Sequence, residues 1–206
     1  MESFDRKQHW ETIYTNKKLQ EVSWYQAIPE TSLNFLKEAC LPKDACIVDI
    51  GGGDSFFTDY LLNEGFTNLT VVDISARALE RAKERLCDKA DAVKWIVADA
   101  SALKLDEPVD FWHDRAAFHF LIHEQEIENY VSGLNEAVKP GGTVVIGTFS
   151  ESGPAKCSGI EIKQYSESSM TELLEPSLEK IKCLEETHET PFNTTQNFVF
   201  CSFRKN

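Results

Sequence analysis

The sequence predicts an α/β fold built on a doubly wound, mostly parallel sheet with helices on both faces. Short apolar runs such as Cys46–Ile50 are bounded by polar residues or glycines, as expected of strands buried on both faces of a parallel sheet. Between residues 29 and 149 these runs alternate with amphipathic helical segments, which is the order of βαβ units. A chain of 206 residues suits one domain, so we expect residues 1–206 to form a single unit.

Three consecutive glycines join the first predicted strand to a helix. Gly51–Gly53 allow a sharp turn and let a ligand approach the backbone closely. We expect the helix to begin near Asp54 and Ser55, both good N-cap residues, and to stop at Gly65. Its predicted buried residues are Phe56, Phe57, Tyr60 and Leu61.

Carboxylates lie at the ends of three successive predicted strands. Asp49 lies at the end of the first strand, Asp73 ends the second (Leu69–Asp73) and Asp99 ends the third (Val93–Asp99). The spacing from the glycine turn places Asp73 beside the ribose hydroxyls of a bound nucleoside. Asp99 is placed to accept a hydrogen bond from an adenine amino group. The pattern predicts a nucleoside site at the carboxyl edge of the sheet.

The residues around the glycine turn favour S-adenosylmethionine (SAM) over a dinucleotide. A dinucleotide site requires a glycine where Phe56 stands, and a helix N-terminus open to a pyrophosphate, which Asp54 would repel. SAM carries a sulfonium and an ammonium but no phosphate, and Asp49 would attract its positive charge. We expect SAM as the cofactor, with S-adenosylhomocysteine (SAH) as its product; an NAD-dependent dehydrogenase is the weaker alternative.

Together these motifs resemble the class I SAM-dependent methyltransferases. The family pattern acid-x-Gly-x-Gly-x-Gly, which wraps the methionyl part of SAM, is matched from Asp49 to Gly53, with Ser55 in place of the last glycine. Lysine methyltransferases that resemble the eEF1A-modifying enzymes carry an Asn-Ser pair at this place, similar to Asp54 and Ser55 here. Asp114 falls where the family has a backbone carbonyl facing the cofactor. The resemblance implies that SAM is bound by Asp49, Gly51, Gly52, Gly53, Ser55, Asp73, Ile74, Asp99, Ala100, Asp114 and Trp24.

The resemblance also implies the rest of the sheet. The family has seven strands and ends in an antiparallel hairpin, with the last strand inserted between the fifth and the sixth. The corresponding segments are a fourth strand near Val109–Asp114, a helix at Glu124–Val138, a fifth strand at Thr143–Phe149, a short helix near Ser166–Leu174, and strands near Leu178–Glu186 and Phe198–Phe203.

Residues 1–28, here called the leader, carry several rings ahead of the first strand: His9, Trp10, Tyr14, Trp24 and Tyr25. The leader either packs on the edge of the sheet or folds as a lid over the cofactor and helps to form the substrate pocket, and both can hold together. Residues 29–206 are then the Rossmann-like core, which begins with an amphipathic helix at Pro29–Cys40.

Methyl transfer from a sulfonium is an in-line displacement with an electrophile that is already activated, so the protein mainly aligns the acceptor and excludes water. A general base is optional. By topology the candidate catalytic residues are His113, Asp114 and Tyr25, with His9 also near and His119 more typical of a core position. No cluster of His, Cys or carboxylates has metal-ligand spacing, so no metal is expected.

Composition limits the partners. A net charge of −13 argues against DNA or RNA as substrate. No apolar run is long enough for a membrane span and the start of the chain has no apolar signal, so we expect a cytoplasmic protein. The six cysteines form no CxxC and are expected to be reduced thiols. The sequence does not define the oligomeric state.

Two acceptors remain open. A small molecule could be enclosed by the leader and the loop at Ser150–Tyr165, which follows the fifth strand. A protein lysine could instead enter an open cleft, attracted by the acidic surface. The short insertion and the lack of an extra domain favour the small molecule. A SAM-binding module without activity is the alternative from another class.

Overall fold

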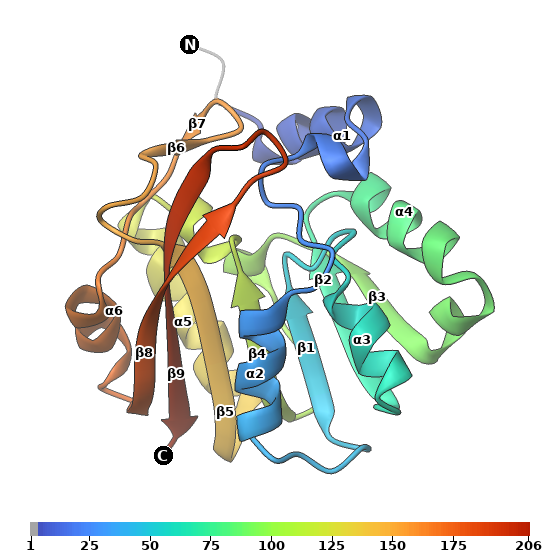
Figure 1. The fold of residues 1–206 in the computed structure, drawn as a ribbon. Coiled ribbons are helices and arrows are strands. Elements are labelled where there is room, and N and C mark those ends of the chain that lie inside the picture. The colour runs from blue at the N-terminus through green and yellow to red at the C-terminus, as the bar shows by residue number, and fades with distance from the viewer. Residues whose placement is uncertain (1–3) are drawn as a thin grey trace.

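The computed structural model describes residues 4–206, and its main feature is a seven-stranded sheet (Figure 1). The first five strands are parallel, and the last one runs antiparallel to both of its neighbours. The predicted fold class is confirmed, including the insertion of the last strand. In spatial order the strands are β3 (Val93–Val97), β2 (Asn68–Asp73), β1 (Cys46–Ile50), β4 (Val109–Arg115), β5 (Val138–Phe149), β9 (Thr195–Lys205) and β8 (Leu178–Glu189).

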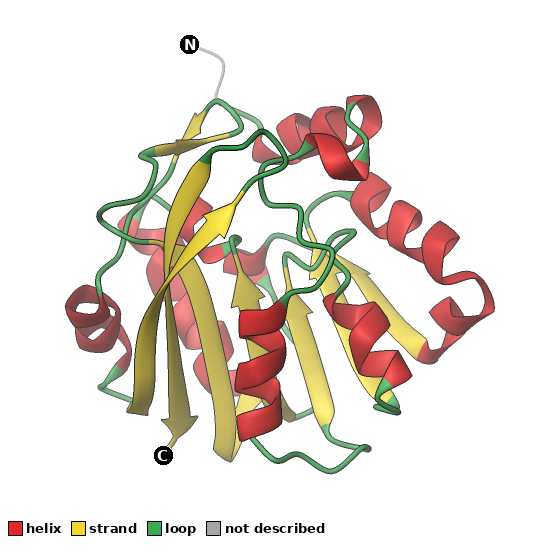
Figure 2. Ribbon diagram, in the orientation of Figure 1, coloured by secondary structure: helices red, strands yellow, loops and turns green. Residues whose placement is uncertain are grey.

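Helices cover both faces of the sheet (Figure 2). One face packs against α2 (Glu30–Glu38), α3 (Phe57–Asn63) and α4 (Ala76–Leu86), the other against α5 (Glu124–Ala137) and α6 (Glu167–Leu174). Each face has its own apolar core because side chains alternate along a strand. The short 3-10 helices are η1 (Leu19–Glu21), η2 (Cys87–Ala92), η3 (Ala100–Ala102) and η4 (Phe118–Phe120).

Side-chain alternation is clearest in β4. Phe111 joins the core under α3, and Trp112 joins the core under α5. His113 then stacks on Phe57 of α3, with 4.2 Å between ring centroids, and Asp114 points to the opposite face. A histidine and a carboxylate that are adjacent in the sequence therefore lie on opposite faces of the sheet.

The leader lies at the carboxyl edge of the sheet. Its helix α1 (Arg6–Asn16) packs against α4 and buries Trp10 and Tyr14 (Figure 1). A small hairpin of β6 (Lys156–Cys157) and β7 (Ile160–Glu161), which the sequence did not predict, lies near the same edge. Residues 1–3 of the predicted leader lie outside the described residues. Within residues 4–206, no helix is both long and apolar enough to cross a membrane.

Two predicted boundaries shift for a local reason. The helix after the glycine turn starts at Phe57, because Asp54 is engaged by Arg81 and the Ser55 hydroxyl accepts the Phe57 N–H at 3.1 Å. Phe56 and Tyr60 are accordingly only half-buried. The third strand ends at Val97, because Asp99 caps the 3-10 helix η3 that follows.

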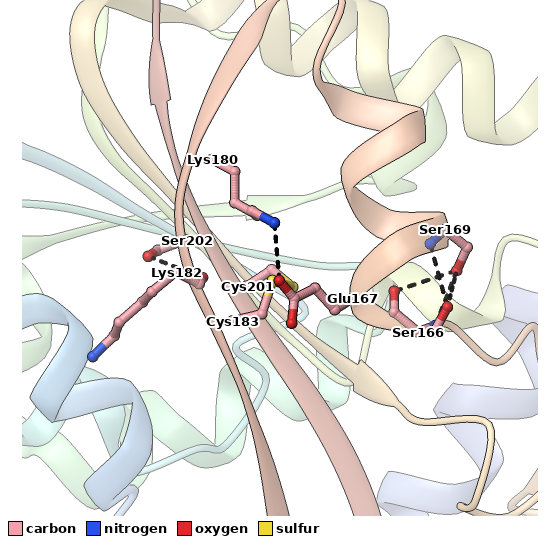
Figure 3. The surroundings of a disulfide bond; sticks show 8 residues. All are labelled: Ser166, Glu167, Ser169, Lys180, Lys182, Cys183, Cys201 and Ser202. Atoms are coloured by element: carbon pink, nitrogen blue, oxygen red, sulfur yellow. Dashed lines mark hydrogen bonds and ion pairs between the residues drawn. A yellow bond between two sulfur atoms is a disulfide. The ribbon is translucent and has the colours of Figure 1, made fainter.

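The prediction that all six cysteines are reduced was wrong. Cys183 of β8 and Cys201 of β9 form a disulfide (Figure 3). The two residues are direct register partners, with Cα atoms 4.1 Å apart, although 18 positions separate them in the chain. Cys40, Cys46, Cys87 and Cys157 are free thiols. The pairing follows from the hairpin register, which the cysteine spacing alone does not reveal.

Candidate active site

A cavity follows the carboxyl edge of the sheet from β3 to β9, under the leader. Six predicted site residues line it: Trp24, Gly51, Asp73, Ile74, Asp99 and Ala100. Of the other predicted site residues, Asp49, Gly52, Gly53, Ser55, Tyr25, His113 and Asp114 are not part of its wall. The cavity is also lined by residues that the sequence did not single out for a site, among them Arg6, Arg115, Phe120, Phe149, Cys157 and Phe198.

The glycine turn has no space for side chains. Gly51 has a φ of +65°, and a Cβ on it would lie 2.4 Å from the Cβ of Ala117. A Cβ on Gly52 would lie 2.5 Å from an oxygen of Asp49, and one on Gly53 would lie 2.9 Å from the Tyr14 hydroxyl. The backbone is therefore closely surrounded, and it forms one wall of the cavity at Gly51.

Asp49 lies buried beneath this turn and is held by a hydrogen-bonded chain. Its Oδ1 is 2.7 Å from His113 Nδ1, and His113 Nε2 is 2.8 Å from the Ser32 hydroxyl. A neutral imidazole satisfies both contacts if Nδ1 donates to Asp49 and Nε2 accepts from Ser32. The second oxygen of Asp49, Oδ2, is buried with no partner in the described residues. An unused carboxylate oxygen below the turn suits a cationic group.

Asp73 ends β2 and lines the cavity, although only 6% of its surface is exposed. Burial raises its pKa to about 7, and nearby Asp54 and Asp49 act in the same direction, whereas a hydrogen bond from the Ser75 N–H opposes the rise. That bond, 2.8 Å long, engages Oδ1. The carboxyl group is therefore placed at a strand end, where it can accept hydrogen bonds from hydroxyls.

Asp99 lies at the far end of the cavity, after β3. Burial raises its pKa, but hydrogen bonds from Ser101 and the charge of Arg6 outweigh burial and hold the pKa below its usual value. Arg6 Nη2 lies 2.9 Å from Asp99 and 2.7 Å from Glu126. The leader is thus attached directly to the residue expected to contact adenine.

Comparison with known proteins relates the chain to methyltransferases. Residues 47–142 match the methyltransferase domain family. An uncharacterized methyltransferase of Mycobacterium tuberculosis is 31% identical over 105 residues, which is 50% of each chain. The matched segment is a little under half of the chain, and these comparisons support the resemblance to the class I SAM-dependent methyltransferases. SAM is the cofactor of this family.

Two further proteins that are similar to this chain have named acceptors. The EEF1A lysine methyltransferase 2 of Danio rerio is 25% identical over 158 residues, covering 68% of this chain and 66% of the relative. A Burkholderia thailandensis 1,6-didemethyltoxoflavin-N1-methyltransferase, solved with its acceptor and SAH bound, shares the fold with a TM-score of 0.72 at 18% identity, over 97% of this chain and 87% of that one. The chain spans about half the length of the first curated relatives it matches.

Asp114 is fully occupied by internal hydrogen bonds. Its Oδ1 accepts the N–H groups of Ala117 and Phe118 at 3.1 and 3.0 Å, and its Oδ2 accepts the Tyr130 hydroxyl at 2.8 Å. Burial raises its pKa to about 6, although these hydrogen bonds oppose the rise. The side chain shapes the turn after β4, and the cavity wall begins one residue later, at Arg115.

The leader is fastened to the core from two sides. Glu11 accepts hydrogen bonds at the N-terminus of α4 from the Ser75 hydroxyl (3.0 Å) and from the backbone N–H of Ala76 (2.7 Å) and Arg77 (3.1 Å). Arg81 donates to the carbonyls of Tyr14 and Lys17, at 3.1 and 2.7 Å, and pairs with Asp54 at 2.8 Å. Arg81 therefore connects the leader, α4 and the glycine turn.

The remaining candidates lie off the cavity wall. Tyr25 packs edge-on against Phe56, with ring centroids 6.2 Å apart. His119 stacks on Phe149, and burial lowers its pKa to about 3, so that it is neutral at physiological pH. His9 contacts the rings of Phe4 and Trp10. Within residues 4–206, no group of three or more His, Cys, Asp or Glu residues is arranged to bind a metal ion.

Proposed function

We propose that this protein transfers a methyl group from SAM to a small-molecule acceptor. The observation that carries the proposal is the course of the cavity. It begins between acids that suit a nucleoside, passes the glycine turn, and continues to an apolar end covered by the leader. The apolar end is lined by the rings of Trp10, Trp24, Phe149 and Phe198.

The residues along this path fit SAM. Asp73 would accept the ribose hydroxyls and Asp99 the adenine amino group, with Ile74 and Ala100 lining the wall beside them. Gly51 would face the methionyl part, and Asp49, buried beneath the turn, would add negative charge near the ammonium end. Ser55 is exposed and its hydroxyl accepts the Phe57 N–H, so its contribution would be to hold the turn. SAM supplies a methyl group that is already activated for transfer.

The chain itself would contribute orientation and exclusion of water. Neither His113, Asp114 nor Tyr25 lines the cavity, and the Cys157 thiol there has a pKa raised to about 11 by burial. Apart from Asp73 and Asp99, which we assign to the nucleoside, the described cavity wall has no carboxylate or imidazole to serve as a general base, and His113 would act by positioning Asp49. Alignment alone can supply on the order of 7–11 kcal/mol of barrier reduction.

The acceptor class is tested by labelling. The purified protein is incubated with methyl-labelled SAM in cell extract, and the extract is separated into macromolecules and small solutes. We expect label among the small solutes. Label confined to protein would contradict the proposal. Label in neither fraction would favour a SAM-binding module without activity.

A protein lysine is the second candidate, favoured by two observations. One relative is an EEF1A lysine methyltransferase, and the net charge of −13 would attract a basic protein segment. The enclosure of the cavity by the leader argues against it, because a lysine side chain must enter from outside. A cytoplasmic location and the absence of a nucleic-acid substrate stay predictions.

A further inference from the structure

Arg115, the last residue of β4, has unused hydrogen-bonding capacity in the cavity wall. Its Nη1 donates to the carbonyl of Trp24 at 3.1 Å. Its Nε and Nη2 are buried and have no partner among the described residues. These two nitrogens share one edge of the planar guanidinium, which is the edge that binds a carboxylate through two parallel hydrogen bonds.

Among the described residues no carboxylate lies within ion-pair distance of Arg115, and the charge of Glu186 acts on it only from farther away. The guanidinium lies over the ring of Phe198, 5.0 Å from its centroid. Burial lowers its pKa to about 10, while the charges of Glu186 and Asp49 oppose that fall. Arg115 is therefore still charged at neutral pH, and it forms no ion pair within residues 4–206. Arg115 as a whole is half-buried, but its two unpartnered nitrogens are shielded from solvent, and shielded donors of a cation are costly unless a ligand supplies the partner.

The position of Arg115 distinguishes the two ends of the cavity. The nucleoside acids Asp99 and Asp73 follow β3 and β2, and Gly51 follows β1. Arg115 ends β4, the next strand along, and its guanidinium extends toward Phe198 on β9, two strands further. It therefore points away from the nucleoside end and toward the apolar end of the cavity.

We propose that Arg115 binds a carboxylate of the methyl acceptor, so that the acceptor is a small carboxylic acid with an apolar body. The inference rests on the proposed function, because it presumes an acceptor small enough to enter the cavity. No bond is made or broken at Arg115. The carboxylate is held while another atom of the acceptor faces the methyl group, and the rings of Trp24, Phe149 and Phe198 contact the apolar body. The methionyl carboxylate of SAM shares this chemistry and is the competing source.

The first experiment separates the two sources by SAH binding. Arg115→Met removes the charge, whereas Arg115→Lys keeps the charge but cannot form two parallel hydrogen bonds. Arg204→Met is the control, because Arg204 is exposed on β9. Calorimetry should give all four proteins, wild type included, the same SAH dissociation constant within about twofold. A loss of about tenfold or more in both Arg115 variants alone would assign the guanidinium to the methionyl carboxylate and overturn the proposal. SAH binding also reports that each variant is folded.

The second experiment tests the charge of the acceptor. Small solutes from cell extract are passed over a strong anion exchanger, and flow-through and salt eluate are each offered to the protein with labelled SAM. We expect label only with the eluate, and we expect Arg115→Met to lower transfer efficiency about 100-fold through KM while Arg204→Met has no effect. Acceptance from the flow-through alone, or unchanged transfer by Arg115→Met, would overturn the carboxylate proposal and leave the small-molecule function standing. No label with either fraction would overturn both.

Discussion

Arg6 of the leader and Asp99 after β3 form an ion pair 2.9 Å long at the nucleoside end of the cavity. The side chains are largely shielded, with 18% and 32% of their surfaces exposed. The other oxygen of Asp99 accepts two hydrogen bonds from Ser101. The carboxylate expected to recognise adenine therefore also holds the leader, so cofactor binding and leader position should be coupled.

Arg6→Ala should loosen both the leader and the cofactor. A partly buried pair of this kind contributes about 1 kcal/mol, so we expect SAH affinity to fall roughly fivefold. Proteolysis within residues 4–28 should become faster, and SAH should suppress it less. Lys7→Ala, an exposed neighbour on α1, is the control. Equal protease resistance in both variants would show that the ion pair does not hold the leader.

Asp73→Ala should lose most of the cofactor affinity while the protein stays folded. The carboxylate lies at a strand end and lines the cavity, so its removal costs ligand contacts and not core packing. Loss of a charged hydrogen-bond partner corresponds to about 1.5–3 kcal/mol, measurable by calorimetry with SAH. Asp99→Ala should cost less, because backbone groups also contact adenine. Unchanged affinity in folded Asp73→Ala would refute its assignment to the ribose.

The same residue should make SAH binding depend on pH. The pKa of Asp73 is raised to about 7 in the ligand-free fold, so the carboxyl is mostly protonated at lower pH. Ribose hydroxyls donate to the ionised form, so affinity should rise by about tenfold between pH 6 and 8. The stability of the ligand-free protein should change with pH in the opposite direction. Folded Asp73 binds its proton more tightly than unfolded Asp73 does, so the contribution of this residue to the free energy of unfolding falls as pH rises from about 4 to 7. Asp73→Asn should bind SAH weakly at both pH values, and a pH-independent wild type would contradict the prediction.

The sequence predicted the architecture because its signals are local. The ends of the first and second strands and the glycine turn are each read from a few adjacent residues, and the structure agrees with them. What it could not predict depends on contacts across long separations. Glu11 binds the start of α4, Arg81 binds the leader, and Arg115 reaches β9, and no short pattern encodes these contacts.

The candidate catalytic residues show the same limit. His113 and Asp114 stand together in the sequence near the predicted methyl position, but alternation along β4 turns them to opposite faces of the sheet. One binds Asp49 and the other shapes the turn after the strand. The next residue, Arg115, has the free donors. Which of three adjacent polar residues enters the cavity is decided by the register of β4 and by Phe198 packing over it.

The disulfide should be measurable as two missing thiols. Titration of the unfolded protein without reductant should find Cys40, Cys46, Cys87 and Cys157 only, since Cys183 and Cys201 are paired. Closing a loop of 18 residues stabilises by about 3 kcal/mol in the chain-entropy description, so reductant should lower the free energy of unfolding by up to that amount. Cys40→Ser should leave the reductant effect unchanged. Six reactive thiols would show that the pair is reduced.

Glu11 offers the most selective test of the leader as a lid, because it attaches α1 to the core without lining the cavity. Its carboxylate caps the N-terminus of α4 with three hydrogen bonds, two of them to backbone N–H groups. Glu11→Gln keeps the size of the side chain but removes its negative charge. The interaction of that charge with the N-terminus of α4 contributes about 1 kcal/mol. We expect faster proteolysis of the leader, weaker SAH binding and reduced methyl transfer, with little change in the unfolding of the sheet. Thr12→Ala, one residue along and on the exposed side of α1, is the matched control.

Deletion of residues 1–26 should abolish methyl transfer while the core stays folded, which extends the effect of Glu11→Gln. If the truncated protein unfolds, the leader serves to complete the core packing around Trp10 and Tyr14, and its role as a lid falls.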